Sequence, residues 1–469
     1  MFYNLKLLFN VILIIISTIC VLRIVFDKRD PKGTICWILF FMLFKTLAII
    51  TFFLLGRNWR NKRFSNNASI FLKEKFETYY SQNKNKELNF LRRLIEKTNP
   101  YPIFTNNQLT FFTDGKSKFK SLKEDLMKAT HHIHLEYYIV RNDNVGNEIK
   151  DILVRKAQEG IKVRFIIDKV GSITLGKKYI IELENSGVEV VPYAYYFAPF
   201  YRNHKKIVII DGVIGYLGGM NLGDEYEGKG KLGFWRDLHI RIEGDFVFNL
   251  QRSFINDYFM INKGKKNPPF IEVEYNNYFP NVESCSSLPM LAVESGPSSD
   301  NPSIMYSILN MISSAKKSIF IMTPYFIPSE SLLISLKIAA LRGIDVRILF
   351  PGKCDHFYVF YASRTYLSEL MQSGVKVYLY RKDSFLHSKA ISVDGKICNM
   401  GNANIDIRSF ELNYELNAII FDDNTVLELE NIFHKECSES TLLDKDFFEN
   451  SSIFIKLLEN ICRMFSNAM

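Results

Sequence analysis

Two long apolar runs open the chain and set it apart from a larger remainder in which apolar and polar residues alternate. Leu7 to Phe26 is a run of 20 residues, and Thr34 to Leu55 is one of 22. As a helix, 20 residues span about 30 Å, the thickness of the bilayer's hydrocarbon core. Because only a short polar stretch separates the runs, we predict a transmembrane hairpin over residues 1–56, with helices at about 7–26 and 34–55. The alternative is a cleaved signal peptide, whose apolar region is usually about 7 to 15 residues long.

Charge and cysteine content both bear on which side of the membrane the remainder lies. The basic residues beside the second run are Lys28, Arg29 and Lys32 before it and Arg57, Arg60, Lys62 and Arg63 after it. Cytoplasmic flanks carry the excess of Lys and Arg, so this small difference places both termini in the cytoplasm. The seven cysteines are scattered without CxxC spacing, which indicates neither a disulfide framework nor a zinc site and fits a reducing compartment.

Beyond residue 110 the hydrophobic pattern occurs twice. The segment 129–140 (ATHHIHLEYYIV) matches 315–326 (AKKSIFIMTPYF), and 156–168 matches 339–351. In the first copy a helical stripe of apolar residues stops at Gly160, and Ile161, Val163, Phe165 and Ile167 then alternate as in a strand. Each copy therefore reads strand, helix, strand, helix, strand, which predicts an α/β fold with a largely parallel or mixed sheet.

The repeat also sets the expected domain boundaries. We predict a polar juxtamembrane lead-in over 57–110, a first domain over 111–275, and a second domain over 276–469 that ends in helices. At 469 residues the chain is long enough for two or three domains, each with its own core.

A short motif, HxKxxxxD, stands at the same place in each copy. Its members are His204, Lys206 and Asp211 in the first copy and His387, Lys389 and Asp394 in the second. Each motif is followed by a turn, GGMN or GNAN, so that Asn221 and Asn404 each lie ten residues past the motif Asp. Two matched copies favour one symmetric site.

Strand geometry separates the motif residues by role. Positions i and i+2 share one face of a strand, so each His points with its Lys, and the Asp seven residues after the His points to the other face. A Lys ammonium suits a phosphate, and an imidazole can attack or carry a proton near neutral pH. The Asp on the reverse face is expected to fix the backbone or the turn. The net charge of +9 suits anionic lipid or nucleic acid without choosing between them.

These residues resemble the phospholipase D superfamily, and the chain as a whole is similar to bacterial cardiolipin synthases of that superfamily. The resemblance extends to GGMNLGDEY at Gly218, FWRDLHIRIEG at Phe234, TPYFIPS at Thr323 and NIDIRSFELNYE at Asn404. It implies two pseudo-symmetric phospholipase D-like domains with mixed sheets flanked by helices, after the membrane hairpin. The chain departs from the family at Asn402, where Ser or Thr is usual, and at Lys45, in a second apolar run that lacks the usual Pro.

The resemblance also implies an activity and its residues. One motif His attacks a phosphatidylglycerol to give a phosphatidyl-histidine and glycerol, and the other acts as general acid and then base while cardiolipin forms. Which His is the nucleophile stays open, with His204 favoured because related enzymes often use the first copy. The catalytic residues would be the six motif residues His204, Lys206, Asp211, His387, Lys389 and Asp394, with Asn221, Asn404, Asp237 and Glu415 binding phosphate or orienting the imidazoles. No metal or other cofactor is expected.

Other functions remain open at this point. The same histidines could use water or another acceptor, which would make the chain a phospholipase D-type hydrolase or a different phosphatidyltransferase. A membrane-tethered nuclease is a more distant alternative, because Lys and Arg do not cluster beyond Arg63 as binding to nucleic acid requires. A purely structural membrane protein would give no reason for two intact motifs. We therefore expect phospholipid substrates, no nucleic acid, and a multi-pass protein of the bacterial cell membrane.

Overall fold

The computed structural model describes residues 2–27, 31–53, 94, 97–98, 101–194, 200–262, 276–283, 286–448 and 450–466. The chain divides into an N-terminal unit, which contains the apolar runs, and a large unit that contains both copies of the repeat. Each unit is considered by itself. Most of the predicted lead-in falls outside the described residues, and so does the end of the second apolar run.

The first apolar run forms one helix, and the second does not. Helix α1 (Phe2–Phe26) is, among the described residues, the one helix long and apolar enough to cross a membrane. The second run forms α2 (Pro31–Leu43) and α3 (Lys45–Thr51), which are separated at Phe44, where φ is −133° and ψ is 58°. The prediction of a single helix over 34–55 is therefore wrong, although its residues are helical on both sides of the break.

Aromatic packing gives the break a physical reason. The ring of Phe52, just after α3, lies 5.7 Å from that of Trp37 and 5.8 Å from that of Phe41, both on α2. Phe41 and Phe52 are buried together with Cys20 and Ile24 of α1. In a straight helix, two residues that are 11 positions apart, as Phe41 and Phe52 are, lie about 16 Å apart along the axis. The break is therefore what brings these rings together.

The large unit is built on one continuous mixed sheet. In the first half the strand order is β4-β3-β2-β6-β7-β9-β1, in which β2, β3 and β4 are parallel and the other neighbours are antiparallel. The strands are β1 (Ile103–Phe112), β2 (His132–Tyr137), β3 (Lys162–Asp168), β4 (Glu189–Tyr193), β6 (Lys206–Ile210), β7 (Ile214–Gly218) and β9 (His239–Gly244). Residues 103–110, which the sequence placed in the lead-in, thus belong to the sheet.

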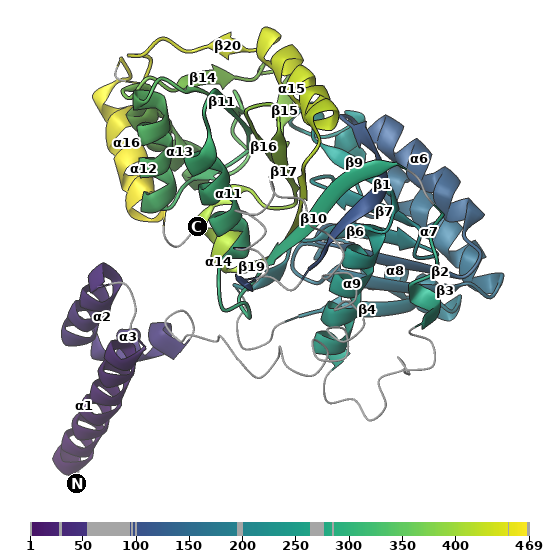
Figure 1. Cartoon of the computed structure of the whole chain (residues 1–469). Coiled ribbons are helices and arrows are strands. Elements are labelled where there is room, and N and C mark those ends of the chain that lie inside the picture. Colours follow the sequence, from purple (N-terminus) through teal and green to yellow (C-terminus); the bar gives the residue numbers. More distant parts are fainter. Residues whose placement is uncertain are drawn as a thin grey trace. The chain divides into compact units, whose positions relative to one another are not determined.

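The second half repeats the same order as β14-β13-β11-β16-β17-β19-β10, with β11, β13 and β14 parallel. Its strands are β10 (Ser287–Ser295), β11 (Ser318–Met322), β13 (Asp345–Phe350), β14 (Lys376–Leu379), β16 (Ala390–Val393), β17 (Ile397–Gly401) and β19 (Asn413–Ile420), with β20 (Thr441–Leu442) added at the edge. The halves join through the antiparallel pair β1 and β10, near the middle of the large unit in Figure 1. The predicted mixed α/β architecture is confirmed.

Helices cover both faces of this sheet, which explains why a central strand such as β6 is apolar at successive positions rather than at alternate ones. On β6, Ile207 and Ile209 enter one core cluster, and Val208 and Ile210 enter another. The first half carries α6 (Gly115–Lys128), α7 (Asn144–Gln158), α8 (Lys177–Asn185) and α9 (Val247–Asn262); the second carries α11 (Ser303–Ser314), α12 (Glu330–Leu341), α13 (Phe357–Met371), α14 (Ile407–Glu411), α15 (Asp423–Ser438) and α16 (Ile453–Met464).

Candidate active site

Each half reaches into the other just before its motif His. Strand β5 (Arg202–Asn203) pairs in parallel with β19 of the second half, and β15 (Ser384–Leu386) pairs in parallel with β8 (Phe234–Arg236) of the first half. The backbone N–H of His204 then donates to the carbonyl of Tyr414, and that of His387 donates to the carbonyl of Arg236. The two crossings are equivalent, so each His is held by the partner half's backbone.

The side chains of the two histidines also contact the opposite half. Nδ1 of His204 lies 2.8 and 3.0 Å from the two carboxylate oxygens of Glu415. Nδ1 of His387 lies 2.6 Å from Oδ2 of Asp237. Each imidazole is therefore paired with a carboxylate from the other half. The family resemblance implied a role for these carboxylates but gave no sign of the exchange.

The motif lysines stand beside the imidazoles, at the start of β6 and just before β16. Lys206 donates to the carbonyl of His204 at 2.6 Å, and Lys389 donates to the carbonyl of His387. Nζ of Lys389 also lies 2.8 Å from Nδ1 of His387 and 3.9 Å from Oδ2 of Asp237. Both lysine side chains are buried. The site thus concentrates two histidines, two lysines and two carboxylates from both halves.

Glycines in the turns after the motifs allow this close packing. A Cβ on Gly219 would lie 2.2 Å from Oδ1 of Asp237, and one on Gly401 would lie 2.5 Å from the carbonyl oxygen of Leu416, the residue after Glu415. A larger residue would displace the Asp237 carboxylate at the first place and the strand that carries Glu415 at the second.

The motif aspartates bind backbone N–H groups and do not contact the imidazoles. The carboxylate of Asp211 accepts from the backbone N–H groups of Thr130, His131 and His132, at the start of β2. Asp394 accepts in the same way from Lys316, Lys317 and Ser318, at the start of β11. Both aspartates have positive φ, 55° and 58°, in the tight turn after their strand. This geometry matches the expectation that they fix the turn and gives them no place among the groups around the imidazoles.

The asparagines of the two tails differ in their surroundings. Asn221 is buried, accepts from the N–H of Ile139 at 3.1 Å and donates to the hydroxyl of Tyr226 at 3.1 Å. Asn404 is also buried, and its Oδ1 has no hydrogen-bond partner among the described residues. Asn402, where the family usually has Ser or Thr, donates to the carbonyl of Gly218 in the other half. An amide at 402 therefore bridges the halves.

Aromatic side chains line the site, and sequence analysis assigned them no role. The ring of Tyr138 lies 4.9 Å from that of His204 and 5.5 Å from Nζ of Lys206. The rings of Trp235 and Tyr325 lie 5.0 and 6.4 Å from that of His387. A signal was present for two of them, because Tyr138 and Tyr325 follow β2 and β11 at the carboxyl ends of parallel strands, where ligands bind in α/β sheets.

Burial keeps both imidazoles neutral. It lowers the pKa of His204 to about 4, although Glu415 partly opposes this effect. It also lowers the pKa of His387 well below its ordinary value, and Lys389, Lys206 and His204 add to that shift. Lys206 and His204 of the first half thus act on His387 of the second. An anionic phosphate between them would favour their protonated forms again.

The two carboxylates respond to burial differently. Burial raises the pKa of Asp237 to about 7, against the pull of Lys389. Burial also opposes ionisation of Glu415, but His204 and Lys206 outweigh it and hold the pKa of that carboxyl below its ordinary value. Burial lowers the pKa of Lys206 to about 7 and that of Lys389 to about 8, although Glu415 and Asp237, respectively, oppose these shifts. Near neutral pH, Glu415 is therefore ionised, whereas Asp237 still binds a proton.

A second buried charge cluster lies behind the first His. Lys205 points to the opposite face from His204, where its ammonium donates to Ser253 at 2.8 Å, to Asp257 at 2.6 Å and to Glu294. Burial opposes the charge on Lys205, but Asp257 and Glu294 raise its pKa well above the ordinary value. This cluster fixes the segment that leads from His204 into β6, and nothing in the sequence indicated it.

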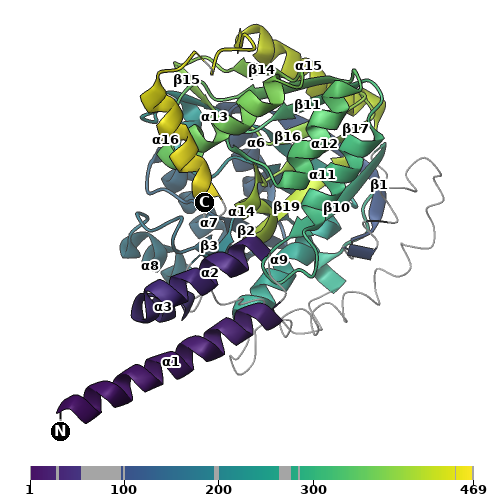
Figure 2. The ribbon, with the colours of Figure 1, turned by 90° about the vertical axis from the view of Figure 1, so that its left-hand side faces the viewer.

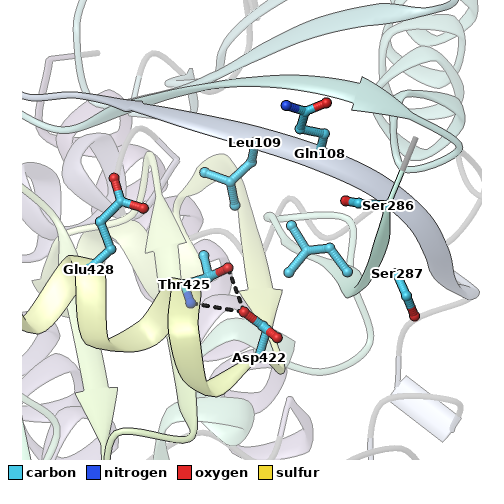
Figure 3. Close-up of a pocket in the computed structure, with 8 residues that line it drawn as sticks. Gln108, Leu109, Ser286, Ser287, Asp422, Thr425 and Glu428 are labelled. Carbon is cyan, nitrogen blue, oxygen red and sulfur yellow. Dashed lines mark hydrogen bonds between the residues drawn. The ribbon is translucent and has the colours of Figure 1, made fainter.

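A shallow pocket of about 170 Å³ lies at the junction of the halves, lined by β1, the start of β10 and the start of α15. Figure 3 shows Asp422 accepting two hydrogen bonds from Thr425 on one wall of this pocket. None of the predicted site residues lines it, so it is separate from the histidine site.

The paired histidine site fits the class that the motifs led us to expect, a phosphatidyltransferase of the phospholipase D superfamily, and the family model and relatives below show that class. A solved phosphatidylserine synthase from Haemophilus influenzae has a similar fold, with a TM-score of 0.62 over 81% of this chain and 97% of that one, at 17% identity. The family described as cardiolipin synthase, PLD-like domain, matches residues 122–227 and 308–437, with one match in each half.

Curated relatives match nearly the whole chain. A cardiolipin synthase from Halalkalibacterium halodurans is 40% identical over 97% of this chain and 93% of its own length. A cardiolipin synthase from a Geobacillus species is 39% identical over 94% of this chain and 89% of its own length. The chain belongs to the cardiolipin synthase family of phospholipase D-like enzymes.

Proposed function

We propose that this site joins two phosphatidylglycerol molecules into cardiolipin and glycerol, with His204 as the nucleophile and His387 as the general acid and base. The observation that carries the proposal is the exchange of carboxylates, because it gives the two imidazoles different partners: Glu415 for His204 and Asp237 for His387. The names of the relatives, which match along nearly the whole chain, support the substrate and the product.

The partner of His204 suits a nucleophile. Glu415 is held ionised, so its carboxylate accepts a hydrogen bond from Nδ1–H of His204. A neutral imidazole with its hydrogen on Nδ1 has a free lone pair on Nε2. That lone pair attacks the phosphorus, and the charge that develops on the ring is stabilised by Glu415.

The partner of His387 suits a general acid. With Asp237 protonated, Nδ1 of His387 is an acceptor, and the neutral ring carries its hydrogen on Nε2. Lys389, 2.8 Å from the same Nδ1, favours this tautomer as well. As Nε2 gives its proton to a leaving oxygen, Nδ1 takes the proton of Asp237, so the ring stays neutral throughout.

Two displacements then complete the reaction. In the first, a bond forms between Nε2 of His204 and phosphorus, the bond from phosphorus to the glycerol oxygen breaks, and His387 protonates that oxygen. In the second, His387 removes a proton from a hydroxyl of another phosphatidylglycerol, and the resulting oxygen displaces His204 from phosphorus. Covalent catalysis of this kind divides one difficult transfer into two easier ones.

The lysines and asparagines would hold the phosphate during both steps. Lys206 and Lys389 lie beside the two imidazoles and supply positive charge where the phosphoryl oxygens become more negative. Asn404 is buried and lies ten residues past Asp394, as Asn221 does past Asp211, and we assign its amide N–H groups to the phosphate. Asn221 positions the loop of Ile139 and Tyr226.

The apolar N-terminal helices indicate where in the cell the protein acts. We propose that α1 and the broken second segment hold the chain in a bacterial cell membrane, with both termini and the catalytic unit in the cytoplasm, as the basic flanks indicate. We also propose two catalytic domains that meet near residue 275, as predicted, but the first begins with β1 at residue 103 and not at 111. Their shared strand order and the two family matches, one in each, support that division.

Lipid analysis of a bacterial host that lacks cardiolipin tests the activity. Expression of the chain is expected to restore cardiolipin, and expression of a His204→Ala variant is not. Accumulation of phosphatidic acid instead would mean that water is the acceptor and the chain is a hydrolase. A lipid other than cardiolipin would mean another acceptor alcohol.

A further inference from the structure

Helix α16 is turned so that its charged residues face the protein. Glu459 is buried and accepts from Arg364 of α13 at 2.6 Å. Arg463 donates to Glu369 of α13 at 2.8 Å. A helix on the surface of a soluble protein normally shows the reverse arrangement, with its apolar stripe on the core and its charges in water.

The opposite face of α16 is apolar and exposed. Its stripe consists of residues at helical spacing, and their exposed fractions are 77% for Ile453, 59% for Leu457, 43% for Ile461 and 80% for Met464. Phe454 and Phe465 flank the stripe and are exposed as well. Apolar side chains that are contiguous and exposed in this way mark an interaction surface rather than ordinary scatter.

Helix α12 continues the same surface on the other side of α13. Its residues Ile334, Ile338 and Leu341 form a second exposed stripe. Glu369 of α13 accepts from both Lys337 of α12 and Arg463 of α16, so one carboxylate ties the three helices together. Figures 1 and 2 both show α12, α13 and α16 side by side on the second half.

A chain of contacts connects this surface with the catalytic site. The ring of Tyr325 lies 6.4 Å from that of His387 and 5.7 Å from that of His356. His356 immediately precedes α13, which begins with two exposed aromatic residues, Phe357 and Tyr358. The ring of Phe357 lies 4.8 Å from that of Tyr361, one turn along α13, which is the helix that binds α16.

We propose that α16, the outer edge of α12 and the start of α13 form a docking face that lies in the headgroup region of the bilayer. A helix with a strongly apolar face, a charged opposite face and modest overall hydrophobicity is what the membrane interface binds. The chain has a helix long and apolar enough to cross a membrane and a net charge of +9, which favours an anionic lipid surface over a second copy of this basic protein.

The consequence concerns substrate entry, and in this respect the inference rests on the proposed function. The docking face would hold Phe357 and Tyr358, at the start of α13, against the lipid. The headgroup of a phosphatidylglycerol could then reach His387 while its acyl chains stay in the membrane.

A photo-crosslinking experiment tests the docking face without requiring turnover. Benzoylphenylalanine replaces Leu457 in the full-length chain, which is reconstituted in vesicles of phosphatidylglycerol and phosphatidylcholine. The matched control carries the same group at Leu427 of α15, an apolar residue that is 49% exposed. Irradiation is expected to give lipid adducts at 457 in at least tenfold excess over 427. Equal yields would overturn the proposal, and so would adducts at 457 mainly to a second chain or to another segment of the same chain.

A charge substitution tests its role in catalysis. Leu457→Glu is expected to raise the KM for phosphatidylglycerol in vesicles about tenfold, while kcat and the melting temperature stay unchanged. The reason is that a charged side chain in the exposed apolar stripe of α16 opposes insertion of that stripe into the bilayer. Leu427→Glu is expected to change neither constant. If Leu457→Glu leaves KM unchanged, docking by α16 has no part in substrate entry. If the unaltered protein makes no cardiolipin, the proposed function fails, and the adduct yields still decide whether the face meets lipid.

Discussion

The replacement Asp237→Asn separates the catalytic role of this carboxyl from its effect on stability. Asn keeps the shape of Asp237, can still accept from the N–H of Leu238 and can still donate to Nδ1 of His387. It therefore preserves the imidazole tautomer but cannot supply a proton when His387 acts as an acid. A positioned general acid contributes about 10² to 10⁴ in rate. We expect kcat to fall about 10²-fold, since the ring stays oriented.

The same variant is expected to be more stable at alkaline pH. Burial raises the pKa of Asp237 from 3.8 to about 7, so the folded protein favours the protonated carboxyl. Ionisation of Asp237 therefore opposes folding increasingly as the pH rises from about 4 to 7, and the full effect above pH 7 is at most about 4 kcal/mol. The Asn side chain avoids this penalty, so the gain in stability should appear at pH 8 and be absent near pH 4.

Glu415→Gln is the matched control, because its expected effect on stability has the opposite sign. The pKa of Glu415 is lowered, so its ionised form stabilises the folded state above its ordinary pKa, and Gln removes that contribution. Melting curves in detergent at the two pH values, together with cardiolipin formation, provide the assay. Near-normal activity of Asp237→Asn, or a loss of stability at pH 8 like that of Glu415→Gln, would refute the reasoning.

Four other predictions concern the site and its support. His204→Ala and His387→Ala should each abolish cardiolipin formation with unchanged circular dichroism; activity in either variant would disprove the two-histidine mechanism. The kcat/KM of the unaltered enzyme should fall above about pH 7, as Asp237 loses its proton, and below about pH 4, as His204 gains one. Asp211→Ala should lower stability by about 1 to 3 kcal/mol through three orphaned N–H groups, yet leave kcat within severalfold in protein that stays folded. Lys205→Met should lower the free energy of unfolding by about 3 to 5 kcal/mol, because Asp257 would remain buried without its cation; an unchanged melting temperature would contradict this.

Sequence could predict the elements that repeat, since period and motif spacing are local properties. The matched segments 129–140 and 315–326 contain equivalent strands, β2 and β11, and each motif lysine lies beside its histidine. The role of Asp211 in the turn could likewise be expected from its face of the strand.

Sequence could not predict features that depend on contacts between distant segments. The exchange of Glu415 and Asp237 between halves follows from β5 and β15, which have two and three residues and no hydrophobic period of their own. The break at Phe44 lacks a Pro or Gly signal and comes from ring packing with Phe52. The role of Lys205 could not be predicted, because Asp257 and Glu294, which bind its ammonium, are distant in the sequence.

The most direct measurement of the central claim is identification of the residue that carries the phosphatidyl group during turnover. Rapid quenching of the enzyme with phosphatidylglycerol, followed by proteolysis and mass spectrometry of the peptides, is expected to find the adduct on Nε2 of His204. An adduct on His387, or no phosphorylated imidazole while cardiolipin is being formed, would contradict the account.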